Sequence, residues 1–196
     1  QTLSAEGAKY LFIITGSAFV YPEMHEVAEP FTRLFERFEI DNFDLEGARE
    51  AITKPLKVEK IPLKVSENVV KMIHKITEGH PFFIVAIMRD ILRETKEGTI
   101  SMREFENMSP RIIEHLTRTK FQDDFNKATD AEKAVLLEIA QLDKRIFAPL
   151  DVKAKSQAKI FERLTKKDLL IKISRGKYRV YHPLFLEYLH KLRRGI

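Results

Sequence analysis

Two stretches near the N-terminus have the hydrophobic patterns of β-strands. Residues 9–15 (KYLFIIT) form a short continuous apolar run that ends at Gly16, which predicts a buried strand of a parallel sheet. Residues 38–43 (FEIDNF) alternate between apolar and polar side chains and predict a second strand. A short helical pattern at 29–36 joins them, so the three segments together predict a βαβ-like piece. Two strands alone cannot form a sheet that is buried on both faces.

Helical periodicity dominates from residue 44 to about residue 127. Capping residues and first-turn prolines divide this stretch into five predicted helices. The predicted boundaries are Asp44 and Pro55 for the first helix, Ser66 for the second, Pro81 for the third, a Ser101 and Glu104 capping box for the fourth, and Ser109 with Pro110 for the fifth.

The order of elements changes after residue 128. A capping box of Thr129 and Glu132 opens this part of the chain. The predicted elements are helices at 130–142, 154–165 and 183–192, and strands at 169–174 and 178–181 that flank a Gly turn. Helix, helix, hairpin and helix is the order of a winged-helix unit. The sequence therefore predicts a mainly α fold with a small β component.

Composition describes a soluble globular protein, with 44% hydrophobic and 32% charged residues. The longest apolar run, 10–14, is far shorter than a membrane span, and no secretory signal pattern is present. The absence of cysteine excludes disulfides and thiolate metal sites, which favours a cytoplasmic protein. Lys, Glu and Ile are plentiful while Cys, Trp and Gln are scarce, which hints at a thermophilic source.

Positive charge is concentrated at the C-terminal end. Residues 151–196 contain 13 Lys and Arg and 4 Asp and Glu, a net charge of +9, whereas residues 1–150 carry −4. The basic residues on or directly after the predicted penultimate helix are Lys155, Lys159, Arg163, Lys166 and Lys167, and those of the predicted hairpin are Lys172, Arg175, Lys177 and Arg179. This distribution predicts an anionic partner such as duplex DNA. A protein-facing or simply solvated surface remains the alternative.

The motifs of several enzyme classes are missing. The sequence holds no G-x-x-x-x-G-K-[ST] loop for a triphosphate, no H-E-x-x-H, no G-x-S-x-G and no clear metal site. Ser17 follows the first predicted strand, at the place where α/β sheets bind ligands, although a plain strand exit would look the same. Arg33 and Arg37 are either solvated charges or phosphate ligands. Gly79, His80 and Pro81 form a helix–helix joint that either only turns the chain or also meets a ligand.

Taken in order, the string LFIITGS…PFTRLFERFEIDNFDLEGAREAITKPL…VVKMIHKITEGHPFFIV resembles the second half of archaeal AAA+/STAND-type ATPases. These are kin to archaeal origin-recognition and NB-ARC ATPases. The resemblance implies three parts: the end of an α/β P-loop ATPase core at 1–43, a helical lid at 44–127 and a winged helix at 128–196.

The resemblance also implies roles for single residues. Ser17 matches the sensor position, Arg33 or Arg37 would act on the γ-phosphate, and Gly79, His80 and Pro81 would lie against the adenine. The Walker A and B segments would lie upstream of Gln1, in a P-loop portion of the same parent. ATP and Mg are then expected only in the complete parent, and this chain alone is expected to be inactive.

A different interpretation keeps the helical part as a scaffold. The chain would then be a winged-helix module that binds DNA or a regulatory protein, without ATPase activity.

Overall fold

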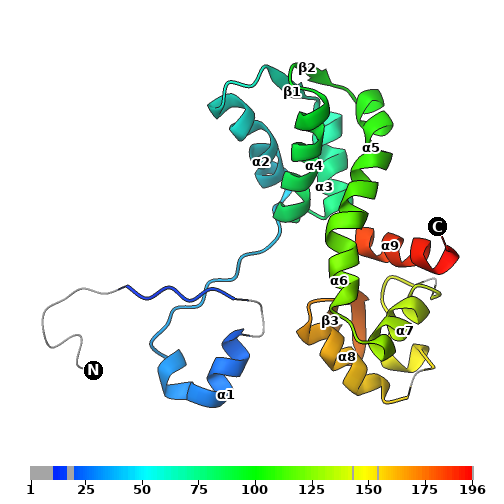
Figure 1. Cartoon of the computed structure of the whole chain (residues 1–196). Coiled ribbons are helices and arrows are strands. Elements are labelled where there is room, and N and C mark those ends of the chain that lie inside the picture. Colours follow the sequence, from blue (N-terminus) through cyan, green and yellow to red (C-terminus); the bar gives the residue numbers. More distant parts are fainter. Residues whose placement is uncertain (1–10, 17–19, 143, 154, 196) are drawn as a thin grey trace, which may run out of the picture. The chain divides into compact units, whose positions relative to one another are not determined.

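The computed structural model describes residues 11–16, 20–142, 144–153 and 155–195 (Figure 1). The chain divides into two compact units, Gln1–Ile40 and Asp41–Ile196, each described by itself below. None of the helices in the described ranges is long and apolar enough to cross a membrane.

The first unit contains helix α1, Val20–Thr32. The predicted helix at 29–36 therefore begins and ends too late. The helix bends at Ala28, where φ is −145° and ψ is 54°, two residues before Pro30. A proline inside a helix clashes with the preceding turn, which accounts for the bend.

The two strands predicted near the N-terminus are wrong for the residues that the structure describes. Residues 11–16 and 38–43 have no strand conformation. A strand needs a partner to receive its hydrogen bonds, and neither described stretch has a paired strand. Their apolar side chains remain open to solvent, with Leu11 84% and Ile40 94% exposed.

The second unit is mainly helical with a small β component, as the sequence predicts. Its elements are α2 Leu45–Val58, β1 Leu63–Val65, α3 Glu67–Thr77, α4 Pro81–Glu94, β2 Gly98–Ile100, α5 Met102–Leu116, the π-helical segment η1 Thr117–Phe121, α6 Gln122–Asn126, α7 Asp130–Ile139, the 3-10 turn η2 Pro149–Asp151, α8 Gln157–Lys166, β3 Leu170–Ser174, β4 Lys177–Val180 and α9 Pro183–Arg194.

Strands β1 and β2 form a parallel pair that the sequence analysis missed. Leu63 pairs with Gly98 and Val65 with Ile100, and the Ser66 N–H continues the ladder by donating to the Ile100 carbonyl at 3.0 Å. The pair joins the loops that precede α3 and α5, at one end of helices α2–α5 (Figure 1). Three-residue strands are too short to produce a recognisable alternation.

Two prolines that were expected to limit helices lie inside them. Helix α2 continues past Pro55 to Val58. Helix α5 runs through Pro110, so the predicted fourth and fifth helices are one. Pro110 cannot donate to the Glu106 carbonyl, and the Ser109 hydroxyl donates to that carbonyl instead, at 3.1 Å. Ser109 therefore compensates for the proline rather than capping a new helix.

One buried core extends from the helical part into residues 128–196. Phe83 of α4, Phe121 of η1 and Phe185 of α9 are fully buried. The rings of Phe83 and Phe121 are 5.7 Å apart, and those of Phe121 and Phe185 are 5.8 Å apart. Burial of each ring contributes about 2 kcal/mol, so α9 is anchored on the helical part by packing.

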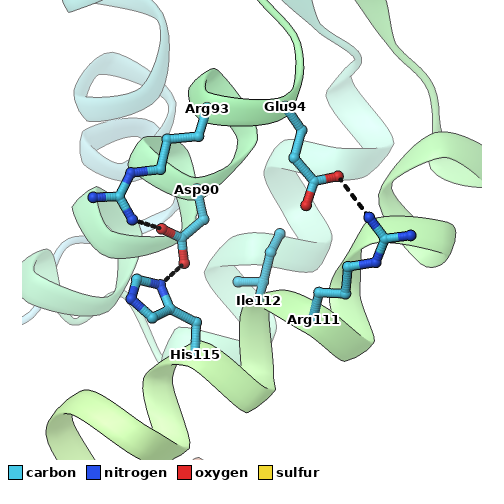
Figure 2. Close-up of a pocket in the computed structure, with 6 residues that line it drawn as sticks. All are labelled: Asp90, Arg93, Glu94, Arg111, Ile112 and His115. Carbon is cyan, nitrogen blue, oxygen red and sulfur yellow. Dashed lines mark hydrogen bonds and ion pairs between the residues drawn. The ribbon is translucent and has the colours of Figure 1, made fainter.

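A polar group interrupts the buried side of α4. Asp90 is 7% exposed, and its carboxylate accepts a hydrogen bond from His115 Nδ1 of α5 at 2.6 Å (Figure 2). Arg93 lies 3.4 Å from the same carboxylate. Neither Asp90 nor His115 stood out in the sequence, although an acid within the apolar stretch 82–91 was a usable signal.

Candidate functional site

The corner between α3 and α4 has the geometry that its residues predict. Glu78 and Gly79 both adopt left-handed backbone conformations, with φ values of 49° and 74°. Pro81 is the first residue of α4, and the His80 ring caps the helix because its Nδ1 accepts from the Phe82 N–H at 3.3 Å. The chain therefore reverses here in three residues.

Gly79 is required by packing within the chain. The Phe43 N–H donates to the Gly79 carbonyl at 2.9 Å. A Cβ at Gly79 would lie 1.9 Å from the Phe43 carbonyl oxygen. The backbone of Phe43 thus occupies the space that a side chain at position 79 would need. Packing at the helix–helix joint is therefore sufficient to explain why this residue is glycine.

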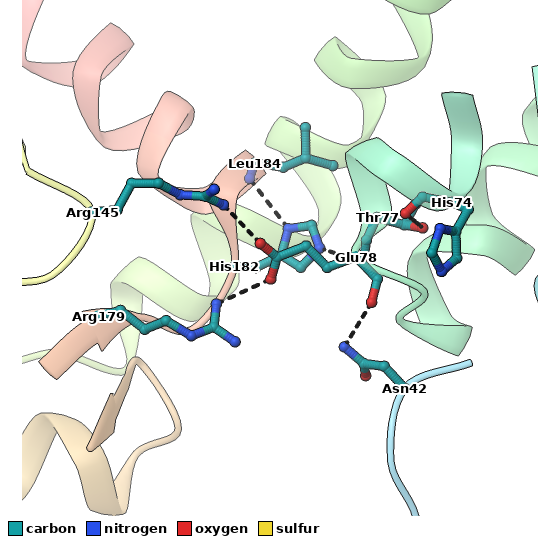
Figure 3. A network of polar contacts seen from close by, with 8 residues as sticks. All are labelled: Asn42, His74, Thr77, Glu78, Arg145, Arg179, His182 and Leu184. Carbon is teal, nitrogen blue, oxygen red and sulfur yellow. Dashed lines mark hydrogen bonds and ion pairs between the residues drawn. The ribbon is translucent and has the colours of Figure 1, made fainter. Parts of the chain in front are cut away.

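Glu78 ties the corner to three other segments (Figure 3). Its carboxylate pairs with Arg145 at 2.8 Å and with Arg179 of β4 at 3.1 Å. Its carbonyl accepts from Asn42 Nδ2 at 3.0 Å. A left-handed residue other than glycine is strained, and these contacts hold Glu78 in that conformation.

His182, at the start of α9, completes the junction. Its Nε2–H donates to the Thr77 carbonyl at 2.9 Å, and its Nδ1 accepts from the Leu184 N–H at 3.2 Å. The ring is buried and its centroid lies 4.0 Å from that of Phe83. Burial lowers the pKa of His182 to about 4, so the imidazole is neutral near pH 7.

Solvent reaches His80 and Pro81 at the corner, as it also reaches Glu78. The side chains of His80 and Pro81 are only partly buried. Burial, and then the positive charge of Lys120, lower the pKa of His80. Partly exposed flat rings fit contact with a nucleotide base. No group of three or more His, Asp or Glu in the described ranges could hold a metal ion.

The three residues matched to γ-phosphate sensing belong to the first unit. Ser17 lies outside the described residues. Arg33 pairs with Glu29 one helical turn earlier. Arg37 pairs with Glu39 at 2.5 Å, and its guanidinium lies 5.0 Å from the centre of the Tyr21 ring. Both arginines thus bind neighbours within that unit.

The nine basic residues predicted to face DNA divide into two groups. Lys167 Nζ binds the Glu132 carboxylate at 2.6 Å, Arg179 binds Glu78, and Lys166 lies 3.7 Å from Glu162. The others are exposed and form no ion pair with another described residue: Lys155, Lys159, Arg163, Lys172, Arg175 and Lys177.

Comparison with protein-family models finds no match, and comparison with curated proteins finds none either. Among solved structures, the chain is similar to a Walker-type ATPase of Pyrococcus abyssi, with a TM-score of 0.58 and 15% sequence identity. The similarity covers 85% of this chain and 49% of that protein. The chain thus spans about half of the length of the archaeal ATPase whose fold it resembles.

Proposed function

We propose that this chain is the lid and winged-helix part of an AAA+/STAND-type ATPase that works as a nucleotide-driven switch. The fold similarity to an archaeal Walker-type ATPase supports this proposal. So does the element order after residue 128, where α7, α8, the β3–β4 hairpin and α9 follow one another as in a winged helix.

The observation that carries the proposal is the double attachment of the α3–α4 corner. One side of the corner offers His80 and Pro81 to a ligand. The other side holds residues 128–196 through Glu78 with Arg145 and Arg179, and through Thr77 with His182. A base bound at His80 and Pro81 would therefore contact the same turn that positions residues 128–196. If the base binds one arrangement of this turn more tightly than another, nucleotide binding shifts the equilibrium between two positions of residues 128–196.

In this proposal the triphosphate and its Mg belong to a P-loop portion of the same parent. When bound, ATP supplies the phosphoryl group whose presence or loss the switch reports. Of this chain's residues, His80 and Pro81 contact the base while Gly79 shapes the turn. Ser17 and either Arg33 or Arg37 sense the γ-phosphate.

Isothermal titration with Mg·ATP tests the proposal. We expect this chain alone to bind Mg·ATP with a dissociation constant above about 1 mM, because its sequence holds no phosphate-binding loop. With the P-loop portion present, Pro81→Ala should weaken nucleotide binding while the circular dichroism of the helices is retained. Pro183→Ala is the matched control, since Pro183 also follows a capping histidine and is also partly buried, but it lies between the buried residues His182 and Leu184 at the start of α9. Low-micromolar binding by the chain alone, or equal effects of the two substitutions, would contradict the proposal.

A second candidate function, DNA binding, is favoured by the six exposed basic residues on and around α8 and the β3–β4 hairpin. Lys and Arg that neutralise phosphates release counterions, so affinity should fall by about 0.9 log unit per log unit of salt for each contact. We expect the reversal of Arg175 and Lys177 to Glu to weaken binding to all duplexes alike. Reversal of Lys96 and Arg103, exposed outside this region, is the control.

Fluorescence anisotropy across a salt series measures this binding. If the chain binds no duplex even at low salt, the basic surface faces a regulatory protein or solvent, and the DNA candidate fails.

A further inference from the structure

Two adjoining hollows lie between α4 and the α5–η1 segment. The first, of about 230 Å³, is lined by Asp90, Arg93, Glu94, Arg111, Ile112 and His115 (Figure 2). The second, of about 340 Å³, is lined among others by Phe82, Arg89, Thr119 and Lys120. Arg93 and His115 line both. The two hollows therefore adjoin at these two residues, and together they are called here the α4–α5 groove.

The middle of the groove carries more cationic groups than its one buried acid can satisfy. Asp90 accepts from His115 at 2.6 Å, while the nearest nitrogens of Arg93 and Arg89 lie 3.4 and 3.5 Å from its carboxylate. Strong guanidinium–carboxylate bonds are about 2.8 Å long. Both arginines are at least half exposed, so most of their donors are available to another acceptor.

Asp90 also orients His115. The Asp90 carboxylate accepts from the Nδ1–H, which leaves Nε2 of the same ring as an acceptor in the groove. Nε2 can therefore receive the O–H of a singly protonated phosphate group. In Figure 2, Arg93 and His115 meet at Asp90, whereas Arg111 and Glu94 face each other on the other side of Ile112 at 3.8 Å. The middle of the groove thus holds two arginines and one fixed imidazole around a single carboxylate.

The end of the groove nearest the start of α4 has a different character. Phe82 is 47% exposed there, and Lys120 Nζ lies 5.7 Å from the centre of its ring. Lys120 also binds Asp124 at 2.8 Å, which holds the ammonium in place. This end combines an apolar ring with one positive charge, so it suits the non-phosphate part of a small ligand.

We propose that the α4–α5 groove binds a small ligand that carries a phosphate group, with Arg89, Arg93 and His115 holding the phosphate. The planar fork of arginine matches phosphate oxygens in pairs. The second hollow, of about 340 Å³, has the volume of a small-molecule site, and the first, of about 230 Å³, adjoins it. Glu94 at one end and Asp124 beside the other interrupt the positive charge, which disfavours a long polyanion. The rest of the ligand lies toward Phe82.

The test is a titration of the chain, without Mg, with inorganic phosphate, pyrophosphate and AMP. Amide and imidazole chemical shifts in NMR spectra report the binding. We expect the phosphate-bearing probes to shift His115 and the facing residues of α4, and affinity to fall as salt rises. Arg89→Gln combined with Arg93→Gln should reduce affinity by about tenfold or more. The control, Arg103→Gln with Arg118→Gln, removes the same charge from the exposed face of the α5–η1 segment and should leave affinity unchanged.

The probes distinguish the sources of the phosphate. Tighter binding of AMP than of inorganic phosphate, with the advantage lost in Phe82→Leu, identifies a nucleoside phosphate. Equal affinities identify free phosphate. Both outcomes support the site. No shift at His115 with any probe up to about 10 mM, equal losses in the control variant, or binding of heparin alone would overturn it.

Two further variants keep the test decisive. If circular dichroism shows that the double Gln variant is unfolded, Arg89→Lys with Arg93→Lys retains the charge but removes the fork, and weaker pyrophosphate binding is then expected. Unchanged binding would overturn the proposal. Pro81→Ala should leave pyrophosphate affinity unaltered, so failure of the nucleotide wall and failure of this groove are separate results.

Discussion

Helices α4 and α9 begin with the same two residues, and the two starts can be compared atom by atom. In each, a histidine caps the helix and a proline is the first helical residue. His80 Nδ1 accepts from Phe82 N–H at 3.3 Å, and His182 Nδ1 accepts from Leu184 N–H at 3.2 Å. The side-chain cap and the first-turn proline are thus shared by the two starts, although φ is −66° at His80 and −147° at His182.

The surroundings of the two histidines differ. His182 is 1% exposed and donates its one ring N–H, on Nε2, to the Thr77 carbonyl. His80 is only partly buried, and its ring centroid lies 6.1 Å from that of His182. One His-Pro start is therefore closed by the rest of the protein, while the other remains open to a ligand. The local sequence determines the cap, and tertiary contacts determine whether it can serve a further role.

The largest effect is expected where the open start meets the rest of the chain. Gly79→Ala places a Cβ 1.9 Å from the Phe43 carbonyl oxygen at a φ of +74°, so the free energy of unfolding should fall by about 4 kcal/mol. Gly176→Ala is the control, because its φ is +72° but nothing lies within 4 Å of a new Cβ; there the loss should be about 1 kcal/mol. Urea denaturation measures the free energy of unfolding of both variants. Equal losses would show that the Phe43 backbone moves to accommodate the new Cβ and would contradict the prediction.

Substitution of His182, at the closed start of α9, should destabilise the protein more than substitution of His80. His182→Ala removes a ring packed on Phe83 and leaves the Leu184 N–H without its acceptor. We expect a loss of about 3 kcal/mol in the free energy of unfolding. The same urea experiment checks this value. A loss below that of His80→Ala would reverse the comparison.

The burial of His182 should also make the free energy of unfolding depend on pH. The folded-state pKa of His182 is about 4, whereas an unfolded histidine titrates near about 6.5. The unfolded state therefore takes up the proton first. Stability is fully present above about pH 6.5 and should fall by about 2 to 3 kcal/mol as the pH drops to about 4. His182→Asn should lose most of this slope when unfolding is measured across the window, and an unchanged slope would contradict the prediction.

Two other groups of titrating residues also contribute to the change of the free energy of unfolding with pH. His80 also has a lowered pKa, mainly through burial, so its contribution has the same sign and should remain in His182→Asn. The pKa values of Asp124 and Glu132 are lowered by partners that include Lys120 and Lys167, against the opposing effect of burial. Their contributions are lost at lower pH, as those carboxylates protonate.

The smallest effect belongs to the open cap. His80→Ala removes one capping bond to an exposed amide, which is worth about 1 kcal/mol. Thermal unfolding followed by circular dichroism checks this expectation. His80→Asn restores an acceptor at the cap and should recover most of the loss. A loss as large as that of His182→Ala would mean that His80 is not the open member of the pair.

Capping and hairpin chemistry could be predicted from the sequence because the partners are neighbours. The Ser101 N–H and the Glu104 carboxylate meet at 2.6 Å, and the Thr129 N–H and the Glu132 carboxylate meet at 2.8 Å. The hairpin pairs as its Gly turn indicates. The caps join residues three apart, and the hairpin pairs are three to ten apart on either side of one turn, so no tertiary knowledge was needed.

The failures have the opposite cause. The apolar run that includes Leu11 forms no strand in the described residues, because a strand depends on a partner that local periodicity does not specify. Asp90 and His115 are 25 positions apart, and Glu78 and Arg179 are 101 apart. Contacts of that range follow from helix packing, which lies beyond a window-based interpretation.

The π-helical turn at Thr117–Phe121 has a consequence for register. Inward-facing residues before it, Met108, Ile112 and Leu116, are four apart, but the next, Phe121, follows after five. Each residue of an α-helix advances the side chains by about 100°, and the wider turn absorbs the extra residue. Removal of one residue here would rotate everything beyond by about that angle. The π-helical turn therefore keeps the inward-facing residues before and after it on the same side of the helix.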